Sequence, residues 1–199
     1  MRLLLATSNL GKVQEMREAL DGLGLEFLTL QDVPSIGQPE ETGKTFAENA
    51  ALKARHYSSA GHPTVADDSG IIVEALKDEL GLHTRRWGAG PQATDAEWIE
   101  HFLQRMKKER NKRATFICTI AHSDSEGQLH LFEGTCDGTI TDDLEADYLP
   151  GLPISACFRP DGEDRVFSAL NVEQKNRTSH RGRALQQLRG HLQKNRLSS

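Results

Sequence analysis

The sequence predicts an α/β fold, a mixed β-sheet with helices on its faces, and three observations lead to this prediction. Short apolar segments alternate with longer segments whose apolar residues recur every three or four positions. Polar turns that contain Gly or Asn separate these segments. Residues 114–121 and 128–133 are rich in β-branched and aromatic residues and flank a polar turn, so they predict an antiparallel hairpin.

Length and composition indicate a globular protein. The 199 residues suit a single domain over residues 1–199, with room for two lobes around a cleft. No apolar run approaches the ~20 residues of a membrane span, and Leu3–Leu5 is too short for a signal peptide. We therefore expect a cytoplasmic protein that does not contact membranes. Three widely spaced cysteines fit reduced, buried thiols better than a catalytic thiol.

The distribution of charge argues against nucleic acid as a general partner. The net charge is −5, which disfavours coating by a polyanion. From Asn171 to the end, however, seven Lys or Arg residues stand against one acidic residue, Glu173. This basic end could meet phosphates or could form a solvated helix face, and binding of RNA by it is a distant alternative.

The N-terminal segment predicts a strand, a polar turn and a helix. Residues 2–6 are apolar enough for a buried strand, and Asn9 is a natural N-cap for a helix that ends near Gly22. Free N–H groups and the helix dipole at such a start attract anions, and Lys12 adds a positive charge. The residues alone slightly favour an ordinary capped helix with a surface lysine over an anion-binding site. Residues 26–30 predict the second strand.

A loop over residues 31–44 leads into a second helix. Thr45 is its expected N-cap, and Glu48 occupies the acidic position of a capping box. Asn49 and Lys53 lie on one stripe of this helix, apart from its inward face, so an amide and an ammonium project together.

The next segment carries adjacent carboxylates. Residues 63–66 predict a short buried strand that delivers an acidic turn, Asp67–Gly70, at its carboxyl end, where open α/β sheets usually bind ligands. Residues 71–76 predict a strand that pairs back beside the turn. With Glu41 and Lys53 upstream, these carboxylates suggest a divalent ion that holds phosphates. Taken alone, such an acidic quartet is more often a surface turn.

The second half of the chain predicts a core helix and a basic helix start. Thr94 and Glu97 form a capping box, and the apolar stripe behind them indicates packing without chemistry. Residues 134–140 extend the hairpin with two glycines where side chains must be absent. Ser179 is the expected N-cap of the last helix. Its basic first turn opposes the helix dipole and costs stability unless a ligand anion or a protein carboxylate compensates.

Four motifs resemble those of the inosine triphosphate pyrophosphatase family, enzymes that remove non-canonical purine nucleotides. They are Ala-Thr-Ser-Asn-x-x-Lys at residues 6–12, Glu-Thr-Gly-Lys-Thr-Phe-Ala-Glu-Asn-Ala-Ala-Leu-Lys-Ala at residues 41–54, Ala-Asp-Asp-Ser-Gly at residues 66–70 and Lys-x-x-x-Ser-His-Arg at residues 175–181. The motifs together span nearly the whole chain, and the second and third at this separation are specific.

The resemblance implies a long twisted mixed sheet with flanking helices, two lobes around a nucleotide cleft and a homodimer. It implies Mg²⁺-dependent hydrolysis of nucleoside triphosphates to monophosphate and pyrophosphate. We expect Glu41 and Asp68 to hold Mg²⁺, Asp68 to serve as the base for water, and Lys12 and Lys53 to neutralise the leaving group. Whether Asp67 joins the metal shell stays open. The expected substrate-binding residues are Thr7, Ser8, Asn9, Lys12, Ser69, Lys175, His180 and Arg181.

The chain departs from the family pattern at the base pocket. Family members usually carry Gly-Phe-Gly-Tyr-Asp-Pro where residues 151–156 read Gly-Leu-Pro-Ile-Ser-Ala, so a stacking ring and a carboxylate are absent. Trp87 and Phe158 are candidate replacements for the ring, and Arg86 matches an arginine near the family's dimer interface and substrate entrance. We expect weaker or altered selectivity for inosine and xanthosine triphosphates. The alternative is a nucleotide-binding member that acts on another nucleotide or has little turnover.

Overall fold

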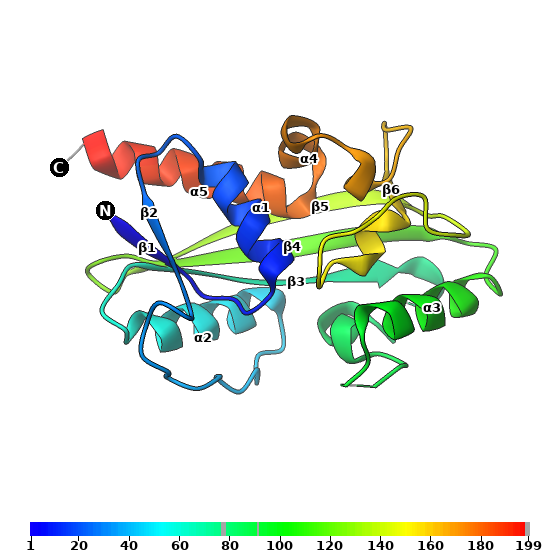
Figure 1. Ribbon diagram of the computed structural model, residues 1–199, viewed down its shortest axis with the longest axis horizontal. Helices are drawn as coiled ribbons and strands as arrows, with labels where there is room; N and C mark the ends of the chain where they lie inside the picture. Colours follow the sequence, from blue (N-terminus) through cyan, green and yellow to red (C-terminus); the bar gives the residue numbers. More distant parts are fainter. Residues whose placement is uncertain (77–78, 91, 198–199) are drawn as a thin grey trace.

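A mixed β-sheet runs through the length of the molecule (Figure 1). The computed structural model describes residues 1–76, 79–90 and 92–197, apart from the side chains of residues 85, 86, 196 and 197. Within this part of the chain the sheet has six strands in the order β2-β1-β3-β4-β5-β6. β1 pairs in parallel with β2 and β3, and the other neighbours are antiparallel. The strands are β1 (Arg2–Leu5), β2 (Glu26–Thr29), β3 (Thr64–Val73), β4 (Arg113–Ser123), β5 (Leu129–Ile140) and β6 (Phe158–Pro160).

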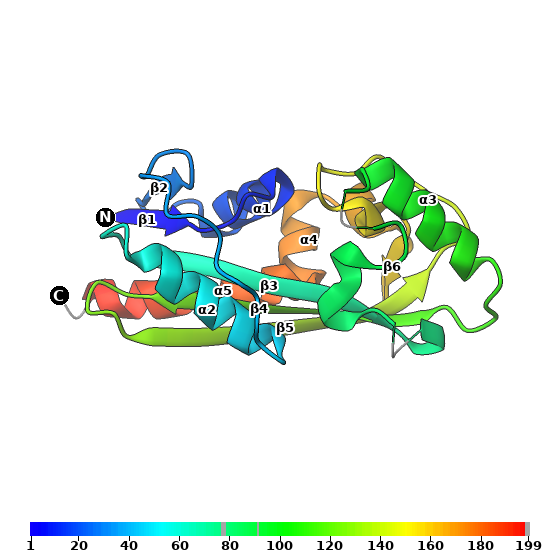
Figure 2. The same ribbon diagram turned by 90° about the horizontal axis from the view of Figure 1, so that it is seen from below.

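The helices cover both faces of the sheet, as the sequence predicts. α1 and α5 lie on one side of the sheet and α2 lies on the other, while α3 packs near the end that carries β6 (Figures 1 and 2). Among the described residues, none of the helices is long and apolar enough to cross a membrane. The helices are α1 (Leu10–Leu20), α2 (Phe46–Ser58), α3 (Asp95–Met106), α4 (Val172–Thr178) and α5 (His180–Leu197).

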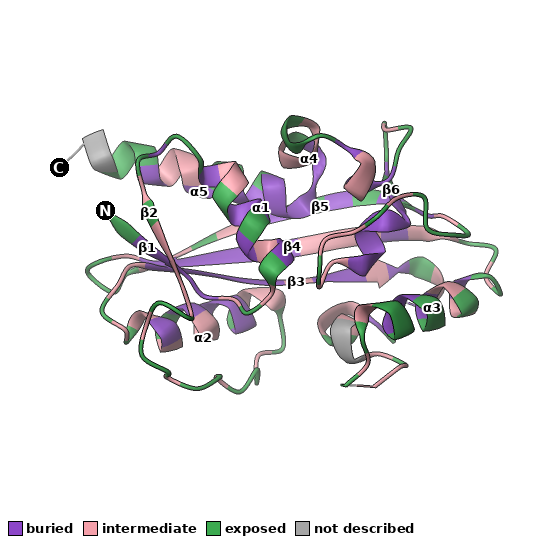
Figure 3. Ribbon diagram, viewed as in Figure 1, coloured by how far each residue is buried: buried purple, intermediate pink, exposed green. Residues whose placement is uncertain are grey.

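Apolar clusters at the two ends of the sheet form two lobes. One cluster surrounds α3 and includes Trp98, Phe102 and Phe158, all almost fully buried. The others pack α1 and α5 or α2 against β1 and the first part of β3. Figure 3 shows the central strands as a mostly buried layer between the helices. This arrangement confirms the predicted α/β fold with lobes on either side of a central region.

The predicted helix caps form, with one difference. The side chains of Asn9, Thr45 and Thr94 accept hydrogen bonds from the first turns of α1, α2 and α3. The expected capping box of α2 is incomplete because Glu48 accepts from the N–H of Lys44 rather than from that of Thr45. A capping side chain satisfies backbone donors that the helix leaves open, so each of these helix starts is fixed.

The largest difference from the sequence-based prediction is in β3. Instead of a strand, an acidic turn and a returning strand, residues 64–73 form one continuous strand that pairs with β4 at every position. The polar side chains do not break it because each face of the strand offers them a cation: Lys12 pairs with Asp67, and Lys53 pairs with Asp68. The carboxylates therefore lie within a strand and not at its end.

A glycine on β5 fixes the position of the start of α5. A Cβ atom added at Gly134 would lie 2.1 Å from the carbonyl oxygen of His180. Such a distance is far inside van der Waals contact, so only glycine lets the helix approach the strand this closely. The predicted need for missing side chains in residues 134–140 is thus explained, and the first turn of α5 is held against the sheet.

Candidate active site

A cavity of about 600 Å³ opens where β1 ends beside β3. β1 pairs with β3 only at Thr64 and Val65, so within the described part of the chain no strand lies beside the rest of that edge of β3. The starts of α1 and α5, one face of α2, and residues 150–155 surround this edge. Every expected catalytic, metal-binding and substrate-binding residue lines the cavity: Thr7, Ser8, Asn9, Lys12, Glu41, Lys53, Asp68, Ser69, Lys175, His180 and Arg181.

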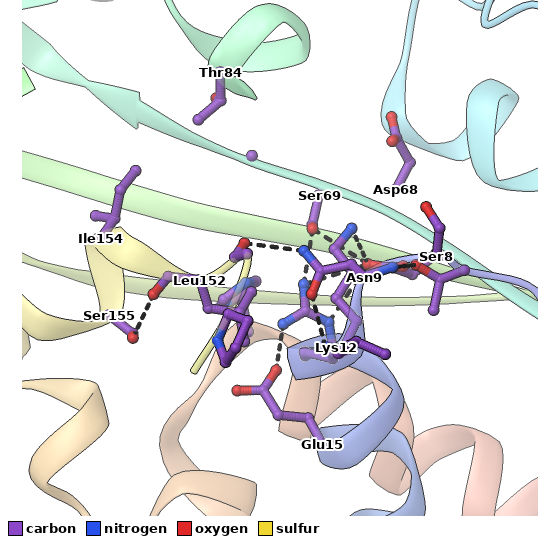
Figure 4. A pocket seen from close by; sticks show the side chains of 18 of the residues that line it. Ser8, Asn9, Lys12, Glu15, Asp68, Ser69, Thr84, Leu152, Ile154 and Ser155 are labelled. Atoms are coloured by element: carbon purple, nitrogen blue, oxygen red, sulfur yellow. Dashed lines mark hydrogen bonds and ion pairs between the residues drawn. The ribbon is translucent and has the colours of Figure 1, made fainter. Parts of the chain in front are cut away.

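Asp68 projects toward α2, away from Lys12 and Glu15 (Figure 4). Its Oδ1 lies 2.8 Å from Lys53 Nζ, and its Oδ2 accepts a hydrogen bond of 3.3 Å from Asn49 Nδ2. Burial raises the pKa of Asp68 above its ordinary value, and the charge of Lys53 offsets only part of that rise. A carboxylate with a raised pKa takes a proton more readily, which is what a general base needs.

Asp67 lies in the opposite environment on the other face of β3. It is 2 % exposed, and its Oδ2 lies 2.8 Å from Lys12 Nζ and 3.3 Å from Arg181. Burial would raise its pKa, but the charges of Lys12, Arg181 and Lys53 outweigh burial and hold the pKa well below the ordinary value. Asp67 is thus a permanent anion that anchors the cations around it.

The basic residues at the start of α5 are compensated from within the protein. Arg181 pairs with Glu15 of α1 as well as with Asp67, and Lys175 also pairs with Glu15. The sequence left open whether a ligand or a protein carboxylate balances this helix start, and buried carboxylates do so. Lys175 and Arg181 therefore border the cavity as members of an ion-pair network.

His180 contributes a neutral ring. Burial, together with the charge of Arg181, holds its pKa well below the ordinary value. The ring stacks on Phe116 with centroids 4.5 Å apart, and its Nδ1 has no hydrogen-bond partner. His180 is therefore an uncharged wall of the cavity rather than an anion clamp.

The polar loop before α1 is held by its own hydrogen bonds. Asn9 Oδ1 accepts from the N–H of Lys12 at 3.1 Å, and Thr7 Oγ1 accepts from the N–H of Asn9 at 3.2 Å. Asn9 Nδ2 donates to the carbonyl of Gly151 at 2.9 Å, so this amide links the loop to another wall of the cavity. Ser8 is exposed beside them. The arrangement directs the start of α1 toward the cavity, a geometry that suits an anion.

Two carboxylates are placed to share a cation. Lys53 Nζ contacts both Asp68 Oδ1 and, at 3.3 Å, Glu41 Oε1, so both side chains face one point. Within the described part of the chain, no three His, Cys, Asp or Glu side chains gather as a metal site. Mg²⁺ commonly takes only one or two protein carboxylates and completes its shell with water and phosphate oxygens. Glu41 and Asp68 fit that pattern.

The other end of the cavity is apolar. Leu152, Pro153 and Ile154 line it, so residues 151–156 do face the cavity. Neither ring suggested as a replacement for the missing aromatic residue lines it: Trp87 packs on His101, and Phe158 packs in the core. The side chain of Arg86 lies outside the described residues. The rings that do line the cavity are Trp98, Phe116, Phe167, Tyr57 and His180.

Sequence reasoning missed Glu15, Trp98 and Phe116. Glu15 follows Lys12 by three residues, so helical spacing places both on one side of α1 and could have paired them. Trp98 and Phe116 look like core residues in an apolar stripe and in a strand. No sequence signal distinguishes a ring that lines a cavity from one that fills a core, because both need the same apolar pattern.

Comparisons with known proteins agree with the motifs. The family model of the Ham1 family matches residues 3–191. A dITP/XTP pyrophosphatase of Leptospira interrogans is 39% identical over 188 residues, 94% of each chain, and one of Thermus thermophilus is 37% identical over 191 residues, 94% of this chain and 90% of the other.

Solved structures agree as well. A HAM1 protein from Coxiella burnetii superimposes with a TM-score of 0.81 at 34% identity, covering 98% of this chain and 99% of that one. The Staphylococcus aureus Ham1 protein gives a TM-score of 0.80 at 30% identity, covering 98% of this chain and all of the other. The match runs along nearly the whole chain in sequence and in structure, and this chain therefore belongs to the Ham1 family.

Proposed function

We propose that this protein hydrolyses nucleoside triphosphates, above all non-canonical purine nucleotides such as dITP and XTP, to nucleoside monophosphate and pyrophosphate. In a cell this reaction clears such nucleotides from the nucleotide pool. The names of its Ham1-family relatives support the substrate class. The observation that carries the proposal is the geometry of two adjacent carboxylates in one cavity, with Asp67 paired to Lys12 and Arg181 and Asp68 paired to Lys53.

In this proposal Asp68, Lys12 and Lys53 have separate roles in the reaction. Asp68, with its raised pKa, accepts a proton from the water that attacks the phosphorus atom joined to the nucleoside. Lys12 and Lys53 bind the departing phosphates and neutralise the negative charge that builds on pyrophosphate. Thr7, Ser8, Asn9 and Ser69 complete the polar wall around them, with Ser69 held by Arg181 at 2.8 Å.

The nucleotide end of the cavity has its own residues. Lys175, His180 and Arg181 contact the nucleotide in this proposal, with His180 uncharged and the two cations oriented by Glu15. Because these contacts come from one buried network, the sugar and base meet a preformed surface. Asp67 stays ionised and holds Lys12 and Arg181 in place.

Mg²⁺ is the proposed cofactor, with Glu41 and Asp68 as its protein ligands. The support is their common approach to Lys53 Nζ, which marks a point where a cation is stabilised. When bound, Mg²⁺ polarises phosphate oxygens and offsets their charge. Lys53 keeps both carboxylates oriented before the ion and the nucleotide arrive.

We also propose that the protein is a homodimer in the cytoplasm. The family resemblance supports the dimer, and the composition of the chain supports the location. Light scattering of the purified protein at several concentrations tests the oligomeric state. A monomer at all concentrations contradicts the dimer.

The decisive experiment incubates the protein with Mg²⁺ and a panel containing dITP, XTP, ITP, ATP, GTP and the pyrimidine triphosphates. Pyrophosphate and orthophosphate are measured separately. The proposal predicts one pyrophosphate per monophosphate, with the deaminated purines hydrolysed best. Stepwise release of orthophosphate indicates a phosphatase instead. Tight binding without turnover indicates a nucleotide-binding protein.

A further inference from the structure

Residues 150–152 bridge two helix starts across the cavity. The N–H of Gly151 donates to Asp95 Oδ2 at 2.5 Å, at the start of α3. On the other side, the carbonyl of Gly151 accepts from Asn9 Nδ2 at 2.9 Å, and Pro150 accepts from the N–H of Gly11 at 3.2 Å. Both backbone groups of one residue are thus bonded to opposite walls of the cavity. Figure 4 shows Leu152 beside Asn9 and Lys12.

The bridge is tightly packed on the α1 side. Gly151 has φ +80°, and a Cβ atom there would lie 2.3 Å from Asn9 Nδ2. A Cβ atom at Gly11 would lie 2.8 Å from both Leu152 Cδ1 and the carbonyl oxygen of Pro150. Two glycines therefore permit the close contact between the loop and the start of α1. On the α3 side the backbone of the loop donates a hydrogen bond to Asp95.

The same loop forms the apolar end of the cavity. After the bridge, Leu152 leads into a short helical turn over Pro153–Ala156, which is closed by the hydrogen bonds of Ser155 to the Leu152 carbonyl. Leu152, Ile154 and Ser155 all line the cavity. The hydrogen bond from Gly151 to Asp95 is the polar tie between this wall and α3, and Ile154 packs in the same apolar cluster as Trp98 of α3.

We propose that Asp95 is a positioning residue for the base of the nucleotide. By accepting the hydrogen bond of Gly151, it holds in place the loop that forms the apolar end of the cavity. A carboxylate acceptor makes a short, directional bond to a backbone N–H, and the start of α3 stabilises its charge. The proposal rests on the nucleotide hydrolysis proposed above and adds the residue that sets base affinity.

The test compares Asp95→Ala with Asp95→Asn, because asparagine keeps an acceptor for Gly151 while removing the charge. Loss of one such bond predicts a rise of about tenfold in KM for ITP, with kcat within about twofold of the starting protein. The KM of Asp95→Asn for ITP is expected to lie within about twofold of that of the starting protein. Inorganic triphosphate, which has no base, serves as a competitive inhibitor, and its inhibition constant is expected to stay unchanged.

Glu97→Ala is the matched control. Glu97 lies in the same turn of α3, caps it through Thr94, and does not line the cavity. Both alanine variants are expected to lower the melting temperature, because each removes a negative charge from a helix start. Only Asp95→Ala is expected to raise KM.

Several results overturn the proposal. An unchanged KM in Asp95→Ala, despite a lower melting temperature, shows that Asp95 only stabilises α3. An equal rise in the inhibition constant of inorganic triphosphate shows that the whole cavity has loosened. Failure of Asp95→Asn to restore KM shows that charge, not the hydrogen bond, matters. If the starting protein lacks turnover, the proposed function fails, and calorimetric binding of ITP and inorganic triphosphate to the same variants tests Asp95 independently.

Discussion

Asp67 and Asp68 are adjacent on β3 and point to opposite faces of the sheet. Each carboxylate lies 2.8 Å from the Nζ atom of a lysine, and the two lysines belong to different helices. Lys12 of α1 contacts Asp67, and Lys53 of α2 contacts Asp68. Arg181 adds a second cation to Asp67 alone. Two chemically identical side chains thus have opposite pKa shifts, one lowered and one raised. The same substitution at the two positions therefore has different consequences.

Replacement of Asp68 by asparagine is expected to remove activity while leaving the fold intact. The amide has the shape of the carboxylate but accepts no proton from water, so turnover should fall by at least about 10²–10⁴-fold. Steady-state pyrophosphate release measures the loss, and calorimetry with a non-hydrolysable triphosphate analogue checks that binding survives. Turnover near that of the starting protein contradicts the role of Asp68.

Replacement of Asp67 by asparagine is expected to act on stability first. It leaves Lys12 and Arg181 facing a neutral group in a buried site, and breaking such a pair typically costs about 3–5 kcal/mol. Denaturant unfolding without nucleotide measures the change in free energy of unfolding. Asp68→Asn is the matched control and should change that free energy much less. Equal stability of the two variants contradicts the anchoring role of Asp67.

Acid should destabilise the protein through His122. This residue is 3 % exposed, neither ring nitrogen has a hydrogen-bond partner, and the rings of His130 and His191 lie close to it. Burial, together with the charges of those two histidines, lowers its pKa to about 4, while Asp124 opposes the shift. The folded protein favours the neutral form of His122. Its contribution to the free energy of unfolding is therefore complete above the pKa of histidine in the unfolded chain, which is about 6.5.

That contribution is lost as the pH falls from about 6.5 towards 4. The lowering of the His122 pKa corresponds to a loss of roughly 3 kcal/mol in the free energy of unfolding. Urea unfolding at several pH values tests this, with His122→Leu as the comparison that removes the titrating group. The starting protein should lose more stability than the variant over this interval. Parallel pH profiles for the two proteins contradict the assignment.

Discrimination between bases is expected to be modest. The loop at the apolar end offers Leu152 and Ile154, and its Ser155 hydroxyl already donates to the Leu152 carbonyl at 2.6 Å. An apolar pocket rejects a similar ligand by only about 10- to 200-fold. We predict a ratio of kcat/KM between ITP and ATP within that range, measured for ITP, XTP, ATP and GTP. A preference above about 10³-fold shows that another group reads the base.

The sequence determined the local elements and the chemistry they carry. Side chains such as Asn9 and Thr94 cap the helices that follow them, since capping depends on a few adjacent residues. The apolar faces of α3 and α5 likewise follow from spacing along one helix. The motifs of the Ham1 family nominate residues that do line a single cavity.

Only the tertiary structure decided how those residues are arranged. The sequence predicts a turn at Asp67–Gly70 because polar residues and glycine favour turns, but Lys12 of α1 and Lys53 of α2 pair with the two carboxylates and stabilise a continuous strand there. The partners of Arg181 likewise come from far along the chain. Pairing of charges across a sheet depends on which segments fold side by side, and local sequence does not contain that information.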